Sequence, residues 1–150
     1  MNKKLLMGFN DLKTKRPDIA EEWHPTKNPF SPQDVLVCKY IKVWWLGKCG
    51  HEWEAYISQR TNTNSPTGCP YCAGKKVLEG FNDLKSLRPD IAKKWAYDLN
   101  EIKPNEVTVA SGKIVWWRCE NGHIWEQRVS ERTGKKSKDT CPICRKNKLD

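Results

Sequence analysis

The strongest constraint on this chain is a set of four metal-binding side chains that occurs twice, with an offset of 72 positions. The first set contains Cys49, His51, Cys69 and Cys72. The second set contains Cys119, His123, Cys141 and Cys144. In both sets, 17 residues separate the histidine from the Cys-Pro-x-Cys pair. Because a complete set of four nitrogen and sulfur ligands is typical of structural zinc, the pattern predicts two Zn²⁺ ions, one in each repeat.

The repetition extends far beyond these ligands. Residues 8–72 align with residues 80–144 without a gap, and 30 of the 65 aligned positions are identical. All eight tryptophans fall into four matched pairs. A duplication of this size predicts tandem modules, with module 1 at residues 1–72, a short linker at 73–79 and module 2 at 80–150.

Each module is small for a protein domain. A unit of about 70 residues buries little apolar surface, so metal or disulfide crosslinks are common at this size. The chain has seven cysteines, an odd count, and its first residues become polar too early for a secretory signal. No stretch approaches transmembrane length. We therefore expect a cytoplasmic protein without a membrane partner, in which zinc is favoured over disulfides.

The chain is basic, with a formal net charge of +9. Three thiolates and one Zn²⁺ make each site −1, so the working charge is nearer +7 (9 − 2). Residues 1–72 carry 10 basic and 7 acidic side chains, and residues 73–150 carry 17 and 11. Glu21-Glu22 becomes Lys93-Lys94 in the second copy, which indicates that the outer helical face is not required to carry either sign. A solvated surface of mixed charge explains this balance, and so does a polyanionic partner.

Each module begins with a short helical pattern. Asn10 or Asp11 can cap the segment that follows, and Pro17 suits a first helical turn. Ile19 and Trp23 are four positions apart, so they are expected to share one helical face and to contact the core. The same pattern returns 72 residues later.

Strand-forming patterns follow in each module. Val35 and Val37 belong to a short run that is rich in strand-forming residues. Val43-Trp44-Trp45 predicts a strand that enters the first zinc knuckle. Neighbouring side chains of a strand point to opposite faces, so one tryptophan is expected inside and the other near the surface. The outer ring would stack on a base or pack against the other repeat. Residues 53–60 alternate between apolar and polar, which predicts a second strand.

The two ligand sets differ at their first cysteine. Cys119 aligns with Gly47, whereas Cys49 aligns with Asn121. The knuckles therefore read Cys-x-His in module 1 and Cys-x-x-x-His in module 2. We expect the thiolate to reach the same metal from a shifted position, with local changes of the backbone accommodating the shift.

At these residues the chain resembles a zinc-ribbon or treble-clef-like family of bacteria and phages, whose repeats carry a Trp-Trp-x-Cys, Gly-His-x-Trp, Arg-Thr and Cys-Pro-x-Cys series. In module 1 the matching residues are Trp44-Trp45, Gly50-His51-Glu52-Trp53, Arg60-Thr61 and Cys69-Pro70-Tyr71-Cys72. In module 2 they are Trp116-Trp117-Arg118-Cys119, Gly122-His123-Ile124-Trp125, Arg132-Thr133 and Cys141-Pro142-Ile143-Cys144. The resemblance covers nearly the whole chain and implies zinc binding in a bacterial or phage-infected cell. Members often occur beside nuclease-type domains, which implies work on nucleic acid.

Together, the repeats and the resemblance predict a small α+β fold. We expect two tandem zinc-ribbon or treble-clef-like modules, each with an N-terminal helical segment and β-hairpin zinc knuckles. Module 1 departs from the family pattern at Gly47 and Cys49.

Eight basic residues of module 2 are candidates for phosphate contact. They are Arg128, Arg132, Lys135, Lys136, Lys138, Arg145, Lys146 and Lys148. The two arginines at 128 and 132 are expected on one strand face, whereas the other six residues flank the last knuckle. A solvated loop and tail explain the same charges. In another interpretation, Arg132 and its repeat Arg60 brace the knuckle carbonyls.

The sequence contains no evident active centre. His24 is the only histidine outside the ligand sets and is replaced by Ala96 in the second copy, so a surface or capping role is expected. Cys38 aligns with Ala110 and is expected to be a small buried residue.

We therefore expect a non-enzymatic protein that binds nucleic acid mainly through phosphates, with DNA favoured over RNA. One alternative is a protein-interaction module, acting as an accessory factor or inhibitor of a nucleic-acid enzyme such as a phage or defence nuclease. A third is a zinc-knuckle nuclease, whose metal-dependent cleavage would be lost on His24→Ala.

Overall fold

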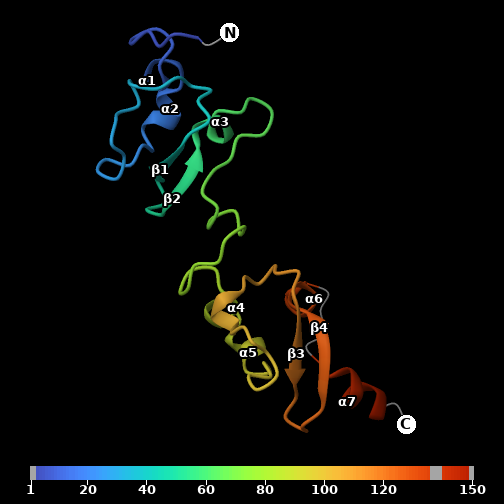
Figure 1. Ribbon diagram of the computed structural model, residues 1–150. Coiled ribbons are helices and arrows are strands. Elements are labelled where there is room, and N and C mark those ends of the chain that lie inside the picture. The colour runs from blue at the N-terminus through green and yellow to red at the C-terminus, as the bar shows by residue number, and fades with distance from the viewer. Residues whose placement is uncertain (1–2, 136–139, 149–150) are drawn as a thin grey trace. The chain divides into compact units, whose positions relative to one another are not determined.

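The structure is a computed structural model that describes residues 3–135 and 140–148. It divides into two compact units, Met1–Ala73 (unit 1) and Gly74–Asp150 (unit 2). In each unit, short helices accompany one two-stranded antiparallel hairpin (Figure 1). The expected small α+β class is therefore confirmed.

Unit 2 repeats the element order of unit 1 and adds a 3₁₀ helix before its hairpin and a helix at its last knuckle. Unit 1 contains α1 (Leu12–Lys15), α2 (Pro17–Ala20), β1 (Lys42–Leu46), β2 (Glu52–Tyr56) and α3 (Ile57–Arg60). Unit 2 contains α4 (Leu84–Leu87), α5 (Pro89–Ala92), the 3₁₀ helix η1 (Pro104–Glu106), β3 (Ile114–Arg118), β4 (Ile124–Arg128), α6 (Val129–Thr133) and α7 (Pro142–Asn147). No helix in the described part of the chain has the length and apolar character needed to cross a membrane.

The first two helices of each unit begin where local chemistry favours it. Asp11 caps α1, and its carboxylate accepts a hydrogen bond from the backbone N–H of Thr14 at 2.9 Å. Pro17 stands in the first turn of α2, where a helix has no use for the missing N–H. Asp83 and Pro89 repeat these roles in α4 and α5. The sequence-based expectations for helix starts are confirmed.

The helical pattern ends earlier than the sequence predicts. α2 ends at Ala20, and Trp23 instead forms an isolated antiparallel bridge with Trp45 of β1. The expected shared helical face of Ile19 and Trp23 is therefore wrong, although both side chains contact the core. Trp23 reaches the core from beside β1, and its ring meets that of Trp45 edge to face at 5.5 Å. Unit 2 has the equivalent bridge.

The hairpins separate the two neighbouring tryptophans of each unit as expected. Trp45 of β1 stands opposite Trp53 of β2, and unit 2 repeats this register. Trp45 and Trp117 are fully buried, whereas Trp44 and Trp116 are partly exposed. Because each strand alternates, the buried rings form the centre of each core and their neighbours lie on the outer face of the hairpin.

A side-chain amide pairs with the free edge of each first strand. The backbone N–H of Trp44 donates to the side-chain oxygen of Asn28 at 2.8 Å, and the amide nitrogen of Asn28 donates to the carbonyl of Trp44 at 2.9 Å. Asn100 and Trp116 make the same pair in unit 2. This asparagine thus satisfies a strand-edge N–H that would otherwise need water, and the carbonyl it bonds to also accepts from the backbone N–H of His24 or Ala96.

The alternating segment after each histidine is a strand only in its first part. β2 ends at Tyr56, which stands opposite Lys42, the first residue of β1, and the backbone N–H of Ile57 still donates to the carbonyl of Ile41 at 3.0 Å. The chain turns into α3 and carries the fully buried Ile57 into the core. The predicted strand over residues 53–60 is therefore too long.

The arginine at the end of this segment is a core residue. The guanidinium carbon of Arg60 lies 4.8 Å from the centre of the Trp45 ring and 5.1 Å from that of Trp53. Arg132 occupies the equivalent place over the rings of unit 2 and is 1 % exposed. The attraction between a cation and aromatic faces offsets part of the cost of burying the charge. The prediction that Arg132 extends an exposed strand face is therefore wrong.

Glu22 is the ionic partner of this buried arginine in unit 1. Its carboxylate pairs with Arg60, and both side chains are largely buried. Lys94 stands at the matching position of unit 2 and cannot accept such a bond. The expectation that this face is not required to carry either sign is therefore wrong at Glu22, whereas Glu21 is 65 % exposed.

The valine-rich run before each hairpin is not a strand. Leu36 forms a single bridge with Asp11, and the chain turns immediately afterwards at Val37 and Cys38. Val35 is buried, but Cys38 is exposed, so the expected burial of this cysteine is wrong. The turn directs its side chain outward.

Candidate metal centres

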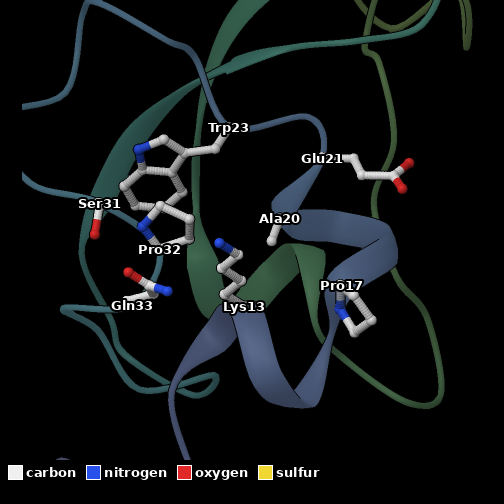
Figure 2. Close-up of a pocket in the computed structure, with 8 residues that line it drawn as sticks. All are labelled: Lys13, Pro17, Ala20, Glu21, Trp23, Ser31, Pro32 and Gln33. Atoms are coloured by element: carbon white, nitrogen blue, oxygen red, sulfur yellow. The ribbon is translucent and has the colours of Figure 1, made fainter. Parts of the chain in front are cut away.

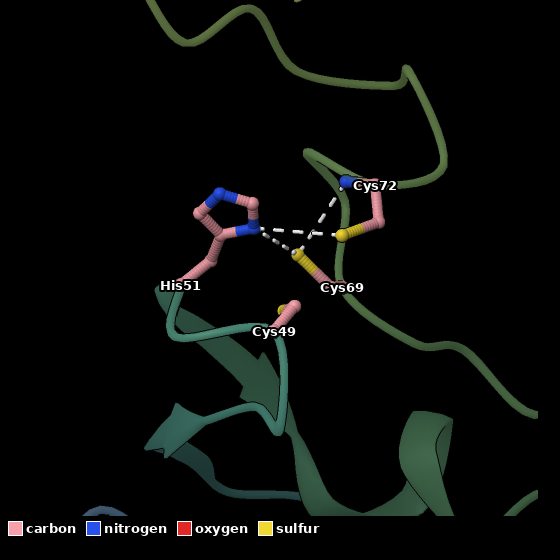
Figure 3. A group of neighbouring side chains, drawn as sticks. All are labelled: Cys49, His51, Cys69 and Cys72. Atoms are coloured by element: carbon pink, nitrogen blue, oxygen red, sulfur yellow. Dashed lines mark hydrogen bonds between the residues drawn. The ribbon is translucent and has the colours of Figure 1, made fainter. Parts of the chain in front are cut away.

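The four ligand residues of unit 1 converge from two segments. Cys49 and His51 come from the turn between β1 and β2, whereas Cys69 and Cys72 come from a later turn (Figure 3). The Nδ1 atom of His51 lies 3.5 Å from the Sγ atoms of both Cys69 and Cys72. All four potential ligand atoms lie within 4.8 Å of one another.

The second set has the same arrangement in unit 2. The Nδ1 atom of His123 lies 3.5 Å from Sγ of Cys119, 3.7 Å from Sγ of Cys141 and 3.2 Å from Sγ of Cys144. The sulfurs of Cys119 and Cys144 are 3.8 Å apart. Cys141 precedes α7, and Cys144 lies in its first turns.

These distances fit tetrahedral zinc. Zn–S bonds of about 2.3 Å and Zn–N bonds of about 2.0 Å give tetrahedral edges of about 3.5 Å between sulfur and nitrogen and about 3.8 Å between two sulfurs. The measured sulfur–nitrogen distances run from 3.2 to 3.7 Å, and the sulfur–sulfur distance is 3.8 Å. Two Cys₃His sets, one in each repeat, therefore fit one Zn²⁺ ion each.

The shifted cysteine of unit 1 reaches the site because its neighbour is glycine. A Cβ atom on Gly47 would stand 2.9 Å from Sγ of Cys49 and 2.9 Å from Cζ3 of Trp53. The sulfur of Cys49 thus lies against the position from which Cys119 projects its side chain in unit 2. Only a residue without a side chain leaves this space open.

The backbone of the knuckle does not change with this shift. The backbone N–H of Gly47 bonds to the carbonyl of His51 at 3.0 Å, and Cys119 makes the same bond at 3.1 Å. Gly50 and Gly122 both have φ +81°, in the left-handed region that favours glycine. The expected local change of the backbone is therefore wrong. Only the side chains differ: the sulfur comes from Cys49 in unit 1 and from Cys119, the counterpart of Gly47, in unit 2.

In unit 2, the residue that aligns with Cys49 is not in the ligand set but hydrogen-bonds to one of the ligands. The side-chain amide of Asn121 donates to Sγ of Cys144 at 3.2 Å. Hydrogen bonds to a coordinating sulfur orient it and stabilise its negative charge. The sequence alignment identified this position only as a missing cysteine.

Backbone N–H groups of the knuckle favour the ionised form of the first cysteine. A hydrogen bond from the backbone of His51 lowers the pKa of Cys49. Burial raises the pKa of Cys119, but hydrogen bonds from the backbone of His123 and Asn121 outweigh burial and bring that pKa to about 7. The thiolate of Cys119 is therefore readily formed near neutral pH, and the knuckle shifts the pKa of Cys49 in the same direction.

The last cysteine of the first set behaves in the opposite way. Burial, with the adjacent thiols of Cys49 and Cys69, raises the pKa of Cys72 to about 11. Sulfurs this close repel one another when all are ionised, so a divalent cation is needed among them. The donor set is thus suited to a metal ion rather than to three free thiols.

The two sites differ in exposure. Cys49 and Cys72 are exposed in unit 1, whereas no ligand of the second set is exposed and Cys141 is buried. In unit 2 the last knuckle continues into α7, but in unit 1 it ends in a turn at Gly74, where φ is +68°. A glycine in this conformation terminates a helical turn.

Five of the eight basic candidates have exposed side chains in the described structure. They are Arg128, Lys135, Arg145, Lys146 and Lys148. Lys136 and Lys138 lie outside the described residues, and Arg132 is buried as described above. Arg128 donates to the carbonyl of Gly112 at 2.9 Å and lies 3.6 Å from Glu131, so part of its charge is already engaged.

His24 is a capping residue and is not on the surface. It is 5 % exposed, and its Nδ1 atom accepts hydrogen bonds from the backbone N–H groups of Thr26 and Lys27, both at 3.2 Å. Its Nε2 atom lies 3.1 Å from the carboxylate of Glu52. The capping role is therefore confirmed, whereas the surface location is wrong.

Comparison with known proteins agrees with this geometry. A family model described as a probable treble clef zinc finger domain matches residues 19–75 and again residues 91–147. Each match contains one complete set of four ligands. Comparison with curated proteins found no match.

Proposed function

The chain belongs to the probable treble clef zinc finger domain family, in two tandem copies, and from this premise we propose that it is a non-catalytic, zinc-stabilised nucleic-acid-binding protein. It contacts nucleic acid mainly through phosphates, and DNA is favoured over RNA. Zinc holds each hairpin knuckle to the later Cys-Pro-x-Cys segment, and basic side chains on these frames attract the polyanion.

The observation that carries this proposal is the basic helix attached to the second zinc site. Arg145, Lys146 and Lys148 are exposed on or directly after α7. Cys141 and Cys144 anchor the start of this helix in the ligand set. The three cations therefore project from a helix whose start is held by the metal site. Less conformational entropy is lost when they bind phosphates.

The overall charge supports the same proposal. The net charge of +9 falls to about +7 when two Cys₃His zinc sites are counted. A basic protein of this kind attracts nucleic acid over a distance set by ionic strength.

The test is the dependence of binding on salt. We expect binding of a duplex DNA to weaken with salt at a logarithmic slope of about 0.9 for each phosphate contacted. Replacing Arg145, Lys146 and Lys148 together with alanine should reduce that slope by about 3. A salt-independent affinity, or no binding at low ionic strength, would contradict the proposal.

A matched variant separates local contact from net charge. Lys39 and Lys42 of unit 1 and Lys75 at the start of unit 2 are exposed lysines away from α7 in the sequence, and their replacement with alanine removes the same charge. We expect this control to reduce the slope by less than the α7 variant does. Equal reductions would indicate that α7 has no special role.

The environment of His24 supports a non-catalytic protein. Its Nδ1 atom is used by two backbone N–H groups, and its Nε2 atom faces Glu52. The other two histidines, His51 and His123, belong to the ligand sets. A catalytic base needs a free nitrogen within reach of substrate. Metal-dependent cleavage of DNA that is lost on His24→Ala would overturn this part of the proposal.

A second candidate function rests on the outer face of the unit 2 hairpin. Ile114, Trp116 and Ile124 are all exposed there, at 61 %, 36 % and 40 %. The matching positions of unit 1 are Lys42, Trp44 and Glu52. An exposed apolar strip of this kind favours a protein-interaction module, acting as accessory factor or inhibitor of a nucleic-acid enzyme.

Unit 1 supplies the substitutions that test this second candidate. The double variant Ile114→Lys, Ile124→Glu gives unit 2 the residues that unit 1 tolerates at the same positions. We expect it to lose a partner captured from nuclease-treated lysate while retaining two zinc ions. Capture that depends on nucleic acid, or that survives the double variant, would reject a protein-docking role for this face.

A further inference from the structure

Unit 1 contains a cavity of about 470 Å³ between α2 and the segment around Pro32 (Figure 2). Its volume lies within the range of roughly 300–1,000 Å³ that small-molecule sites occupy. The residues that matter for its chemistry are Lys13, Pro17, Ala20, Trp23, Pro32 and Gln33. The cavity lies outside the zinc ligand set.

Three of the side chains that line this cavity have counterparts that are buried in unit 2. Trp23, Ala20 and Pro32 are all partly exposed in unit 1. Their counterparts in unit 2 are buried: Trp95 is 3 % exposed, Ala92 is 4 % exposed, and Pro104 is fully buried. Unit 1 therefore exposes part of an indole and a proline that unit 2 covers, and an accessible apolar wall of this kind is typical of a binding site.

The walls are apolar and contain rigid rings. Trp23 and Pro32 lie on one side, and Ala20 and Pro17 of α2 lie on the other (Figure 2). The indole N–H of Trp23 donates to the carbonyl of Phe30 at 3.2 Å. The indole therefore offers its ring surface rather than a hydrogen bond, which suits a flat apolar guest.

Two polar groups line the cavity without a hydrogen-bond or ion-pair partner among the described residues: the ammonium of Lys13 and the side-chain amide of Gln33. The one acidic group on the lining, Glu21, is paired with Lys48 at 3.3 Å. An amide can bond to the edge of a base, and an ammonium can bond to a phosphate. The polar groups therefore complement a nucleotide.

We propose that this cavity binds one unpaired base of a single-stranded nucleic acid, with the adjoining phosphate at Lys13. The inference rests on the proposed nucleic-acid binding and makes it more specific. The base inserts between the Trp23–Pro32 wall and α2, and the Gln33 amide bonds to its edge. A protein side chain would use the apolar walls but has no equivalent use for both polar groups.

The probes are two single-stranded decamers that differ by one base. One is abasic at every position, and the other carries a single central adenine. We expect the unmodified protein to bind the adenine decamer about tenfold more tightly, as is typical when one base stacks in a protein site. Equal affinities would overturn the cavity proposal but leave phosphate binding intact. Failure to bind either decamer would contradict the proposed function as well.

The variant Ala20→Leu fills the cavity from a helical position that is partly exposed. We expect it to abolish the preference for the adenine decamer, to leave the affinity for the abasic decamer unchanged and to retain two zinc ions. A preserved preference in this folded variant would overturn the proposal. If Ala20→Leu fails to fold, Gln33→Ala replaces it, because Gln33 is exposed, and it should reduce the preference severalfold.

A matched lysine pair tests the phosphate contact. Lys13→Ala should weaken binding of the adenine decamer more than Lys85→Ala, its counterpart in unit 2, because only Lys13 adjoins the described cavity. Equal effects would contradict a specific role for Lys13. N-acetyl-leucine amide and deoxyadenosine monophosphate provide a last comparison by NMR. Perturbation of the Ala20 methyl signal by the first and not by the second would indicate a protein ligand and overturn the proposal.

Discussion

The two units hold the same donor set on the same hairpin turn, yet they supply the first sulfur from different positions. Cys49 lies two residues after Gly47, whereas Cys119 stands at the position of Gly47 itself. The knuckle hydrogen bonds and the glycine φ angles agree between the units. The metal therefore requires a sulfur at one point in space, and two chain positions can place it there.

The units also differ in what surrounds this common frame. Unit 2 encloses its ligands more fully and extends the last knuckle into a basic helix, α7. Unit 1 leaves Cys49 and Cys72 exposed and opens the cavity beside Trp23. Duplication has therefore kept the zinc frame and the tryptophan core, while the outer surfaces have diverged.

The largest expected effect is the loss of one zinc site. His51→Ala should reduce the zinc content from two ions to one and unfold unit 1, because structural zinc contributes on the order of 10 kcal/mol to the folding of such modules. His123→Ala should do the same to unit 2. Zinc content by mass spectrometry and hydrogen exchange of each unit provide the measurements. A variant that keeps both ions or an undisturbed exchange pattern would contradict the assignment.

The next effect concerns the buried arginine of unit 1. Glu22→Lys introduces the residue found in unit 2 and leaves Arg60 facing a like charge. Because the pair is largely buried, we expect the free energy of unfolding to fall by about 3 kcal/mol. Denaturant unfolding measures the change. Glu21→Lys is the control, since this neighbouring side chain is 65 % exposed and should change stability by about 0.5 kcal/mol or less.

A third prediction tests the exchange of the first cysteine. Gly47→Ala places a Cβ 2.9 Å from Sγ of Cys49, so unit 1 should lose about 1–3 kcal/mol of stability and bind zinc less tightly. The double variant Gly47→Cys, Cys49→Asn copies unit 2 and should restore two tightly bound zinc ions. Competition with a zinc chelator gives the affinities. Failure of the double variant to recover affinity would show that the knuckles are not interchangeable.

The smallest effect is a difference in the rate of zinc release. Unit 1 exposes two of its ligands, so a chelator should extract its ion first. We expect release in two phases of equal amplitude, followed with a zinc-sensitive dye. The variant His51→Ala should retain only the slow phase, and His123→Ala only the fast phase. A single phase from the unmodified protein would remove the distinction between the sites.

The sequence predicted those features that depend on spacing between nearby residues. Asp11 and Pro17 start helices because their side chains act on the adjacent backbone. Trp44 and Trp45 divide between outer face and core because a strand alternates. These outcomes need no information about distant parts of the chain.

Contacts between distant segments produced the errors. Trp23 leaves the helical pattern to form a bridge with Trp45. The alternating segment after His51 turns into α3, which carries Ile57 into the core. The alternating pattern predicts Arg60 as a polar residue of a strand. In the structure its side chain lies over two indole rings and is buried. Local periodicity cannot reveal such pairings.

The two donor sets, the duplication and the division of each tryptophan pair could all be predicted, since they follow from residue type and separation along the chain. The folded structure was needed to show that Cys49 can replace a cysteine at position 47 with the same knuckle hydrogen bond. It also decided that Arg132 lies in the core and that Trp23 borders a cavity. These outcomes depend on which distant groups occupy the surrounding space, because close packing leaves each side chain only the room its neighbours allow.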